Sequence, residues 1–166
     1  MSVILADGQG SGRAAKSLSM QITAKVASLL KEGVRDGAAA RAANDFLYAS
    51  RHGQVSATLD IISVDLKTPS NVRTYREAER RLGLHGRTRP WIAEEPVVSG
   101  MRVLLVSDGI ANSGLRSHQT PWDLAELAAF VPADQPAKDV ADGILQEAVR
   151  RDQGRPGDDM SVVALI

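Results

Sequence analysis

The chain opens with Ile4-Leu5-Ala6-Asp7-Gly8-Gln9-Gly10-Ser11-Gly12, the stretch that decides how its first elements fold. Apolar residues typical of a strand lead into a turn with one carboxylate and three glycines within six residues, and a helical pattern starts directly afterwards. Gly8 has no Cβ, so the backbone there can pass close to a ligand. Two interpretations follow. Either the glycines wrap a phosphate at a helix N-terminus, or Asp7 and the Gly8 carbonyl offer oxygens to a divalent cation.

This stretch fits the known phosphate-binding loops poorly. A dinucleotide fingerprint requires G-x-G-x-x-G and a P-loop requires G-x-x-x-x-G-K-[ST], whereas residues 8–12 read G-x-G-x-G. Asp7 stands directly before the glycines and would repel a bound phosphate unless a cation lay between them. The stretch therefore predicts further carboxylates elsewhere in the chain that share a cation with Asp7.

Composition excludes several classes of protein. The 166 residues are enough for one domain with a buried core, and 20 basic against 20 acidic residues give no positive excess for binding nucleic acid. There is no cysteine, which excludes disulfides and thiolate metal sites, and the three histidines lie without ligand spacing. No apolar stretch approaches the ~20 residues of a membrane span, and no secretory signal is recognisable. We expect a single domain over residues 1–166, located in the cytoplasm.

The apolar pattern predicts helices and strands in alternation. Helical spacing predicts helices over 13–32, 36–51, 122–131 and 137–151. Alternating or continuous apolar runs predict strands over 56–66, 72–75, 91–98, 101–106 and 158–166. The charged block 76–89 is expected to form a loop or short helix, and the polar segment 110–120 an exposed flap.

Three of these strand ends carry an aspartate beside a glycine, namely Asp7, Asp108 and Asp158. Each one taken alone is explained equally well by ordinary turn chemistry. All three together favour a convergent carboxylate site, where mutual repulsion calls for a divalent cation. A set of oxygen ligands without cysteine or clustered histidine suits Mg²⁺ or Mn²⁺ better than zinc.

Four motifs now carry a specific resemblance. They are the glycine turn at 7–12, the strand start at 56–60, Val106-Ser107-Asp108-Gly109, and the segment 157–163 that contains Asp158-Asp159. In order and rough spacing they resemble the metal-dependent protein phosphatases (the PPM superfamily), and within these the bacterial SpoIIE/RsbU/RsbX branch. The resemblance implies an α+β fold, a four-layer α-β-β-α sandwich of two antiparallel sheets flanked by helices.

The resemblance also implies a site. A binuclear Mn²⁺ or Mg²⁺ centre would activate a water that attacks phosphoserine or phosphothreonine directly. By motif, Asp7 matches the carboxylate that bridges both metals, Gly8 supplies a backbone carbonyl, and Asp108 and Asp158 match further ligands. Asp7, Asp108 and Asp158 are therefore the expected catalytic residues. Asp159 matches a position that is often Asn or Asp, with a weaker claim to direct ligation.

The chain departs from the family pattern in several places. The family has a strand before the glycine turn, whose acidic residue helps to hold the second metal, and this chain begins six residues before Asp7. We therefore expect a sandwich without that first strand and a second metal site without that ligand. Gln9 stands where animal-type relatives have a histidine proposed as general acid. No phosphate-binding arginine is assigned by motif, and Arg13, the basic residue nearest the turn, is expected to be a solvated helix-start side chain.

The resulting prediction is a metal-dependent serine/threonine protein phosphatase that acts on a phosphorylated STAS-domain protein in a partner-switching or stressosome pathway. The alternative is a catalytically weak or inactive phosphatase-fold module that acts as a regulatory binding partner. A third interpretation, a nucleotide-binding α/β domain, leaves Asp108 and Asp158 unexplained. The expected partner is a phosphoprotein, with no nucleic acid and no membrane.

Overall fold

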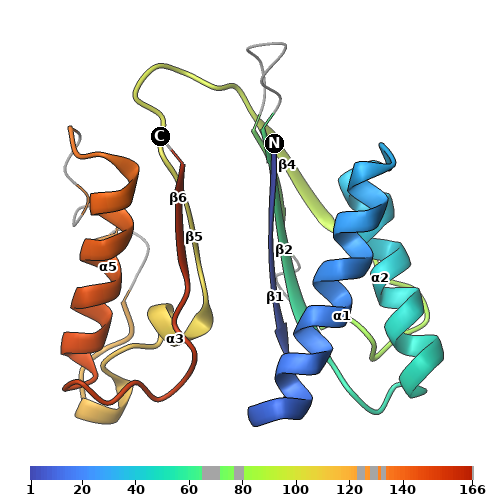
Figure 1. The fold of residues 1–166 in the computed structure, drawn as a ribbon, viewed down its shortest axis with the longest axis horizontal. Helices are drawn as coiled ribbons and strands as arrows, with labels where there is room; N and C mark the ends of the chain where they lie inside the picture. Colours follow the sequence, from blue (N-terminus) through green and yellow to red (C-terminus); the bar gives the residue numbers. More distant parts are fainter. Residues whose placement is uncertain (65–71, 77–80, 123–125, 128–130, 132–133, 166) are drawn as a thin grey trace. The chain divides into compact units, whose positions relative to one another are not determined.

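The structure, a computed structural model, describes residues 1–64, 72–76, 81–122, 126–127, 131 and 134–165. The chain folds into two compact units, Met1–Val97 and Val98–Ile166, each of which is described by itself. Each unit consists of helices packed on an antiparallel sheet (Figure 1).

The first unit is built on a four-stranded antiparallel sheet. Its strands are β1 (Ser2–Gly8), β2 (Ala57–Val64), β3 (Val72–Arg76) and β4 (Trp91–Glu95), and they follow one another in sequence order across the sheet. In the register of β1 and β2, Ile4 lies opposite Ile61 and Asp7 opposite Thr58. Every second side chain of β2 faces the helices, and two of these, Leu59 and Ile61, are buried in the core.

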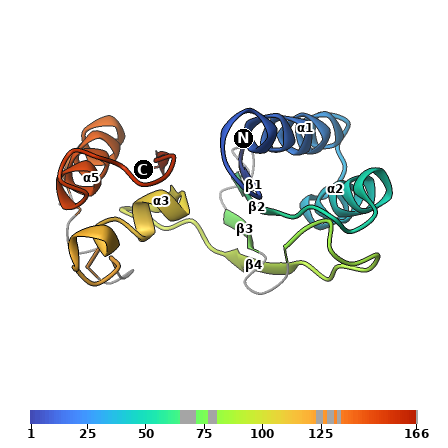
Figure 2. The ribbon, with the colours of Figure 1, turned by 90° about the horizontal axis from the view of Figure 1, so that it is seen from below.

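Two helices cover one face of this sheet (Figures 1 and 2). Helix α1 (Gly12–Lys31) buries Ala15, Leu18, Ile22 and Val26, the spacing of a single helical face. It ends in a Schellman motif, in which Gly33 has φ +82° and the Val34 N–H donates to the Leu29 carbonyl at 3.0 Å. Both helix boundaries agree with the sequence pattern to within one residue.

Helix α2 (Asp36–Arg51) packs its small residues into the same core, where Ala39, Ala40 and Ala43 are completely buried. One polar residue, Asn44, is buried among them. Its side chain accepts from the Gly83 N–H at 2.9 Å and donates to the His85 carbonyl at 3.0 Å. Because both ends of the amide are paired, Asn44 holds residues 83–85 against α2 without leaving a buried polar group unsatisfied.

The second unit is smaller. Strands β5 (Val103–Val106) and β6 (Val162–Leu165) pair antiparallel, and helix α5 (Ala137–Arg151) packs on them through Val140, Ile144 and Ala148 (Figure 1). The bounds of α5 are those that the sequence predicts. A four-residue helix, α3 (Asp108–Ala111), follows β5, and a short 3₁₀ helix, η1 (Leu115–Ser117), follows α3.

Two predictions for this unit are wrong. Segment 110–120 is not an exposed flap throughout, because Ile110 is fully buried in the core of the unit and Ser113 is 1% exposed. The last strand begins at Val162 and not at Asp158, since the Asp158 carboxylate accepts the Asp159 N–H at 2.8 Å and so favours a turn over a strand. The predicted helix 122–131 falls largely outside the described residues.

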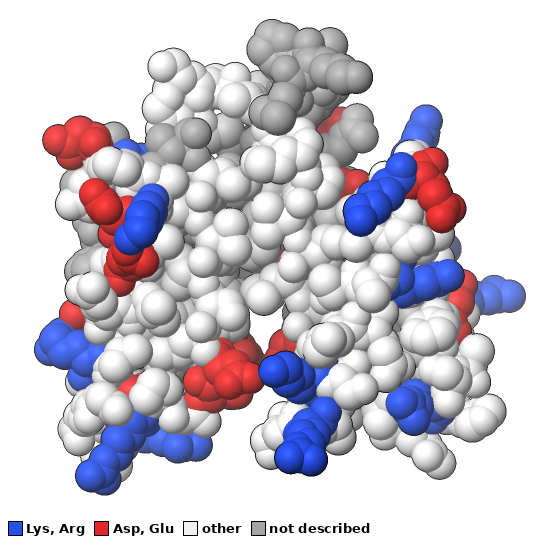
Figure 3. Space-filling model, in the orientation of Figure 1, with Lys and Arg blue, Asp and Glu red and all other residues white. Residues whose placement is uncertain are grey.

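The class is confirmed as α+β with two antiparallel sheets, whereas a single domain over 1–166 stays a prediction. On the face drawn in Figure 3, acidic and basic side chains are interspersed, in keeping with the balanced composition. Within the described parts of the chain, every helix is too short or too polar to cross a membrane.

Candidate metal centre

Asp7 lies one residue before the end of β1. Ile4 and Ala6 pack against the core beneath α1, so the alternation of the strand directs Asp7 to the opposite face of the sheet. The residue is exposed, and its strand partner is Thr58. Asp7 therefore lies at the end of β1, exposed on the face of the sheet opposite α1.

The three glycines after Asp7 serve the fold itself. Gly10 and Gly12 have φ +98° and +73°, values that side-chain-bearing residues rarely adopt. Helix α1 approaches Gly8 so closely that only glycine fits, because a Cβ there would lie 2.7 Å from the Ala15 carbonyl oxygen. The Gly8 N–H also donates to the Ser19 hydroxyl at 2.9 Å. The close approach at Gly8 is thus made by a helix of this chain, and ligation by the Gly8 carbonyl stays a prediction.

Gln9 has a structural role that no local sequence pattern indicates. Its side-chain oxygen accepts from the Ser56 N–H at 3.0 Å and from the Ser56 hydroxyl at 2.9 Å, and its own N–H donates to the Ser56 carbonyl at 2.8 Å. Ser56 is 2% exposed, so these bonds satisfy polar groups that water does not reach. Gln9 therefore fastens the glycine turn to the start of β2, immediately beside Asp7.

In the second unit, Ser107 joins the two segments that carry the predicted ligands Asp108 and Asp158. Its hydroxyl donates to the Asp159 carbonyl at 3.0 Å and accepts from the Ser161 N–H at 2.9 Å. Its backbone N–H donates to the Ser161 carbonyl at 3.0 Å. These bonds extend the β5–β6 pairing by one step, so the residue after Ser107 and the turn before β6 lie side by side.

Gly109 makes this approach possible. A Cβ at Gly109 would lie 2.4 Å from the Asp159 carbonyl oxygen, a distance that no real side chain tolerates. Close packing therefore requires glycine after Asp108, in addition to the preference of turns for an Asp-Gly pair. Asp108 and Asp158 are both exposed at this end of the unit. Figure 3 shows acidic side chains gathered there, near α3 and the loop before β6.

The predicted ligands thus fall into two sets, Asp7 with Gly8 in the first unit and Asp108 with Asp158 in the second. Within the described residues, no group of three or more His, Asp or Glu side chains is assembled as a ligand set. The donor chemistry nevertheless fits a hard divalent cation. All donors are carboxylate or carbonyl oxygens, and in the second unit a hydrogen-bonded serine holds two exposed carboxylate-bearing segments together.

Comparison with known structures defines the class of fold. The chain is similar to the structure of the PP2C phosphatase domain and a fragment of the regulatory domain of SpoIIE from Bacillus subtilis, with a TM-score of 0.82 and 20% identity over 98% of this chain and 53% of that one. It is also similar to the catalytic domain of the serine/threonine protein phosphatase PstP in complex with 2 manganese ions, with a TM-score of 0.69 and 18% identity over 98% of this chain and 85% of that one. The fold is that of a PP2C phosphatase domain.

Comparison of the sequence with protein-family models identifies the family. The family model for stage II sporulation protein E (SpoIIE) matches residues 69–166, more than half of the chain. This chain belongs to the SpoIIE family. Among curated proteins, stage II sporulation protein E of Bacillus subtilis (strain 168) is 22% identical over 97% of this chain. The chain spans 21% of the length of that relative.

Proposed function

We propose that this chain is a metal-dependent serine/threonine protein phosphatase. The observation that carries the proposal is the pair of hydrogen bonds at the Ser107 hydroxyl, one donated to Asp159 and one accepted from Ser161. They keep Asp108 beside the Asp158 turn in a chain of the SpoIIE family. Carboxylates held side by side can bind the divalent cations that a metal-assisted phosphate hydrolysis requires.

Asp7, the Gly8 carbonyl, Asp108 and Asp158 would hold the cations. The two manganese ions of PstP support Mn²⁺, with Mg²⁺ as the other hard cation that suits these ligands. When bound, such cations activate water and neutralise charge on the phosphoryl group. The water oxygen forms the new P–O bond, the P–O bond to the serine or threonine oxygen breaks, and the proton ends on that hydroxyl.

The chain's own residues supply position and access. Ser107 and Gly109 keep the Asp108 and Asp158 segments together, while Gln9 anchors the turn after Asp7. The carboxylate-bearing residues are exposed, so a phosphorylated side chain on another protein can reach them. We assign the substrate to a phosphorylated STAS-domain protein of a partner-switching or stressosome pathway, in the cytoplasm, on the strength of the motif resemblance to the SpoIIE branch.

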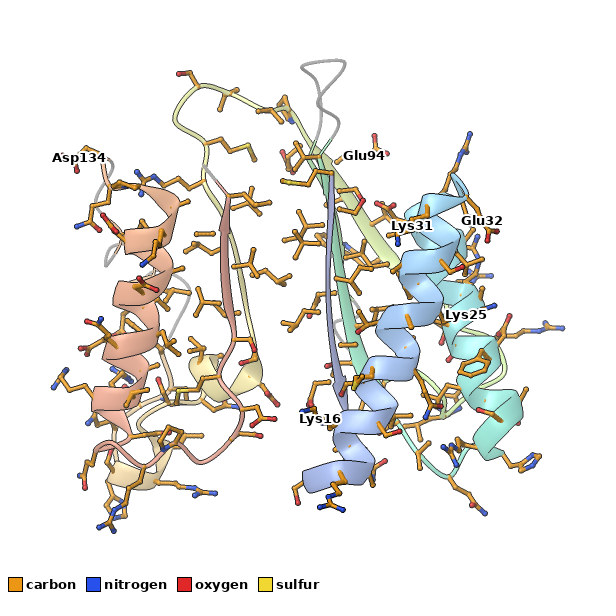
Figure 4. All side chains as sticks on the ribbon, in the orientation of Figure 1. Lys16, Lys25, Lys31, Glu32, Glu94 and Asp134 are labelled. Carbon is orange, nitrogen blue, oxygen red and sulfur yellow. The ribbon has the colours of Figure 1, made fainter. Side chains whose placement is uncertain are left out.

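The test is hydrolysis of p-nitrophenyl phosphate with Mn²⁺, with Mg²⁺ and with EDTA, by the wild type, Asp108→Asn and Asp134→Asn. Asp134 is the matched control, because it is an exposed aspartate of the same unit that precedes α5 (Figure 4). Turnover that requires the metal, is lost in Asp108→Asn and is kept in Asp134→Asn supports the proposal. Phosphoserine peptides and a phosphorylated STAS domain then test the substrate class.

A rate with Mn²⁺ equal to that with EDTA, on protein with the expected circular dichroism, would overturn the enzyme proposal. Manganese binding by calorimetry without turnover of any phosphopeptide would support the alternative, a non-catalytic binding module. Equal losses in Asp108→Asn and Asp134→Asn would show that the metal-dependent activity does not depend on this site.

A further inference from the structure

The second unit contains a surface pocket that the proposed reaction does not use. It has a volume of about 470 Å³ and is formed by η1 and the turn after α5. Its lining residues are Arg116, Ser117, Asp152, Gln153 and Arg155. The lining thus contains two arginines and one carboxylate. Whether the pocket is positively charged depends on whether Asp152 pairs with either arginine.

Asp152 is fully engaged by the backbone. One of its carboxylate oxygens accepts the Gly114 N–H at 2.7 Å, and the other accepts the Gly157 N–H at 3.2 Å. Asp152 therefore ties the segment before η1 to the segment before Asp158. Its side chain forms no ion pair with either pocket arginine among the described residues, so the arginine charges are not cancelled by a direct partner.

Arg116 lies against the chain directly before Asp158. Its Nη2 donates to the Gly157 carbonyl at 3.2 Å. A Cβ at Gly157 would lie 2.7 Å from the guanidinium carbon, so the guanidinium lies close against Gly157 where a side chain would otherwise be. Within the described residues the bond to Gly157 is the one side-chain hydrogen bond of Arg116, so four of its five N–H donors are open to a ligand.

Arg155 completes the positive side of the pocket. Within the described residues, its side chain has no hydrogen bond or ion pair, although its backbone N–H is held by the Asp152 carbonyl at 3.0 Å. The neighbouring Arg151 is committed elsewhere, because it donates to the Ser113 and Thr120 carbonyls and stacks over Trp122 at 5.3 Å. The two arginines that remain available both face the pocket.

We propose that this pocket is an anion subsite that binds an acidic side chain of the protein substrate next to the phosphorylated residue. The inference rests on the proposed phosphatase function and deepens it. Arg116 contacts Gly157, and Gly157 precedes the predicted metal ligand Asp158. A substrate with its phosphate at Asp158 would therefore bring its flanking residues to the pocket. A planar guanidinium that presents several donors suits a carboxylate, and a free phosphate would use the same chemistry.

The experiment compares two phosphoserine peptides that differ only in the flanking residues, Glu in one and the isosteric Gln in the other. Fluorescence anisotropy with Mn²⁺ on phosphonate analogues of the two peptides, whose P–C bond is not hydrolysed, measures binding without turnover. The value of kcat/KM with Mn²⁺ is measured separately on the phosphoserine peptides. We expect the wild type to prefer the Glu peptide by roughly 5- to 10-fold. Arg155→Ala should bring this ratio close to one. Lys25→Ala, an exposed residue on α1 of the first unit (Figure 4), should leave it unchanged.

Arg116→Ala provides a second variant with the same expected loss of preference. Arg116→Ala removes the bond to Gly157 and can disturb the segment before Asp158. Arg155 makes no side-chain bond to the rest of the described chain, so Arg155→Ala tests the subsite without that disturbance. A Glu/Gln ratio that stays the same in Arg155→Ala would overturn the subsite. Binding of inorganic phosphate that is lost in Arg155→Ala, together with a wild-type Glu/Gln ratio close to one, would assign the pocket to free phosphate and overturn the peptide assignment.

The two proposals fail in different ways. If p-nitrophenyl phosphate is not hydrolysed, the phosphatase proposal fails, while the anisotropy ratio of the phosphonate peptides still decides whether the pocket binds acidic side chains. If p-nitrophenyl phosphate is hydrolysed but both peptides bind and react equally, only the subsite fails.

Discussion

The hydroxyl of Ser107 donates a hydrogen bond to the backbone carbonyl of Asp159, 52 residues further along the chain, at 3.0 Å. The same hydroxyl accepts the Ser161 N–H at 2.9 Å. One small side chain therefore connects the strand end that carries Asp108 to the turn that carries Asp158. If these aspartates act together, Ser107 positions them without contacting the substrate.

Ser107→Ala should accordingly weaken both the unit and its metal affinity. Loss of two hydrogen bonds is expected to lower the free energy of unfolding by about 1–2 kcal/mol. The apparent dissociation constant for Mn²⁺ should rise, because Asp108 and Asp158 are no longer held together. Urea unfolding and calorimetric titration measure the two effects. Ser99→Ala, at an exposed serine of the same unit without a side-chain hydrogen bond among the described residues, is the control. Equal behaviour of the two variants would contradict the positioning role.

Gly109→Ala tests the close approach of α3 to the Asp158–Asp159 turn. The added methyl group would lie 2.4 Å from the Asp159 carbonyl oxygen, so the turn must move. Overpacking of this kind costs about 1–3 kcal/mol of stability. The matched control is Gly86→Ala, whose new Cβ would meet its nearest atom, on Tyr48, at an ordinary 3.4 Å. Manganese titration should show weaker binding for Gly109→Ala alone, and unchanged affinity would refute the link between packing and site.

Gln9→Ala should destabilise the glycine turn. The substitution leaves the N–H and hydroxyl of Ser56 without their acceptor at a site that is 2% exposed, which costs about 1–3 kcal/mol. Gln9→Glu keeps an acceptor oxygen and should be milder. Gln21→Ala, at an exposed glutamine on α1, should change the urea midpoint little. A Gln9→Ala midpoint equal to that of the wild type would mean that the bonds to Ser56 contribute nothing.

Asp158→Asn and Asp159→Asn separate the two adjacent carboxylates. We expect Asp158→Asn to abolish metal-dependent hydrolysis of p-nitrophenyl phosphate and the rise in melting temperature that Mn²⁺ causes. Asp159→Asn should have a smaller effect, because it is the Asp159 backbone, rather than its side chain, that bonds to Ser107 and Asp158. The reverse order of severity would transfer the ligand role to Asp159.

The stability of α5 should depend on acid pH through Glu147. Bidentate hydrogen bonding from Arg150 lowers the pKa of Glu147 below its usual value. A lowered pKa in the folded state adds stability above the unfolded pKa, and this stability is lost as the pH falls through the folded pKa. Glu147→Gln should therefore lower the urea midpoint slightly at pH 7 and not at pH 3. The effect is small because Arg150 is 71% exposed. Glu95→Gln, at an exposed glutamate of β4, is the control, and a Glu147→Gln effect that persists unchanged at pH 3 would contradict this origin.

Much of the fold follows from local pattern. The apolar spacing of α1 and α5 predicts each helix to within one residue, because a helix that buries one face must repeat its apolar residues at helical spacing. The motifs around Asp108 and Asp158 likewise indicate the family from the sequence, because each lies within one short stretch at a strand end or turn. The class of the fold, the helices α1, α2 and α5, and most strands could therefore be predicted from the sequence.

Other features required the tertiary structure. Segment 110–120 is polar in sequence, yet Ile110 is fully buried, because α5 and the β5–β6 sheet enclose it. The roles of Gln9, Ser107 and Gly109 depend on partners 47 to 54 residues away, which no local pattern identifies. The sequence by itself determined which residues form each element and which carboxylates are candidates for metal. The tertiary structure decided which backbone atoms hold those carboxylates in place, because hydrogen bonds between distant segments exist only once the chain has folded.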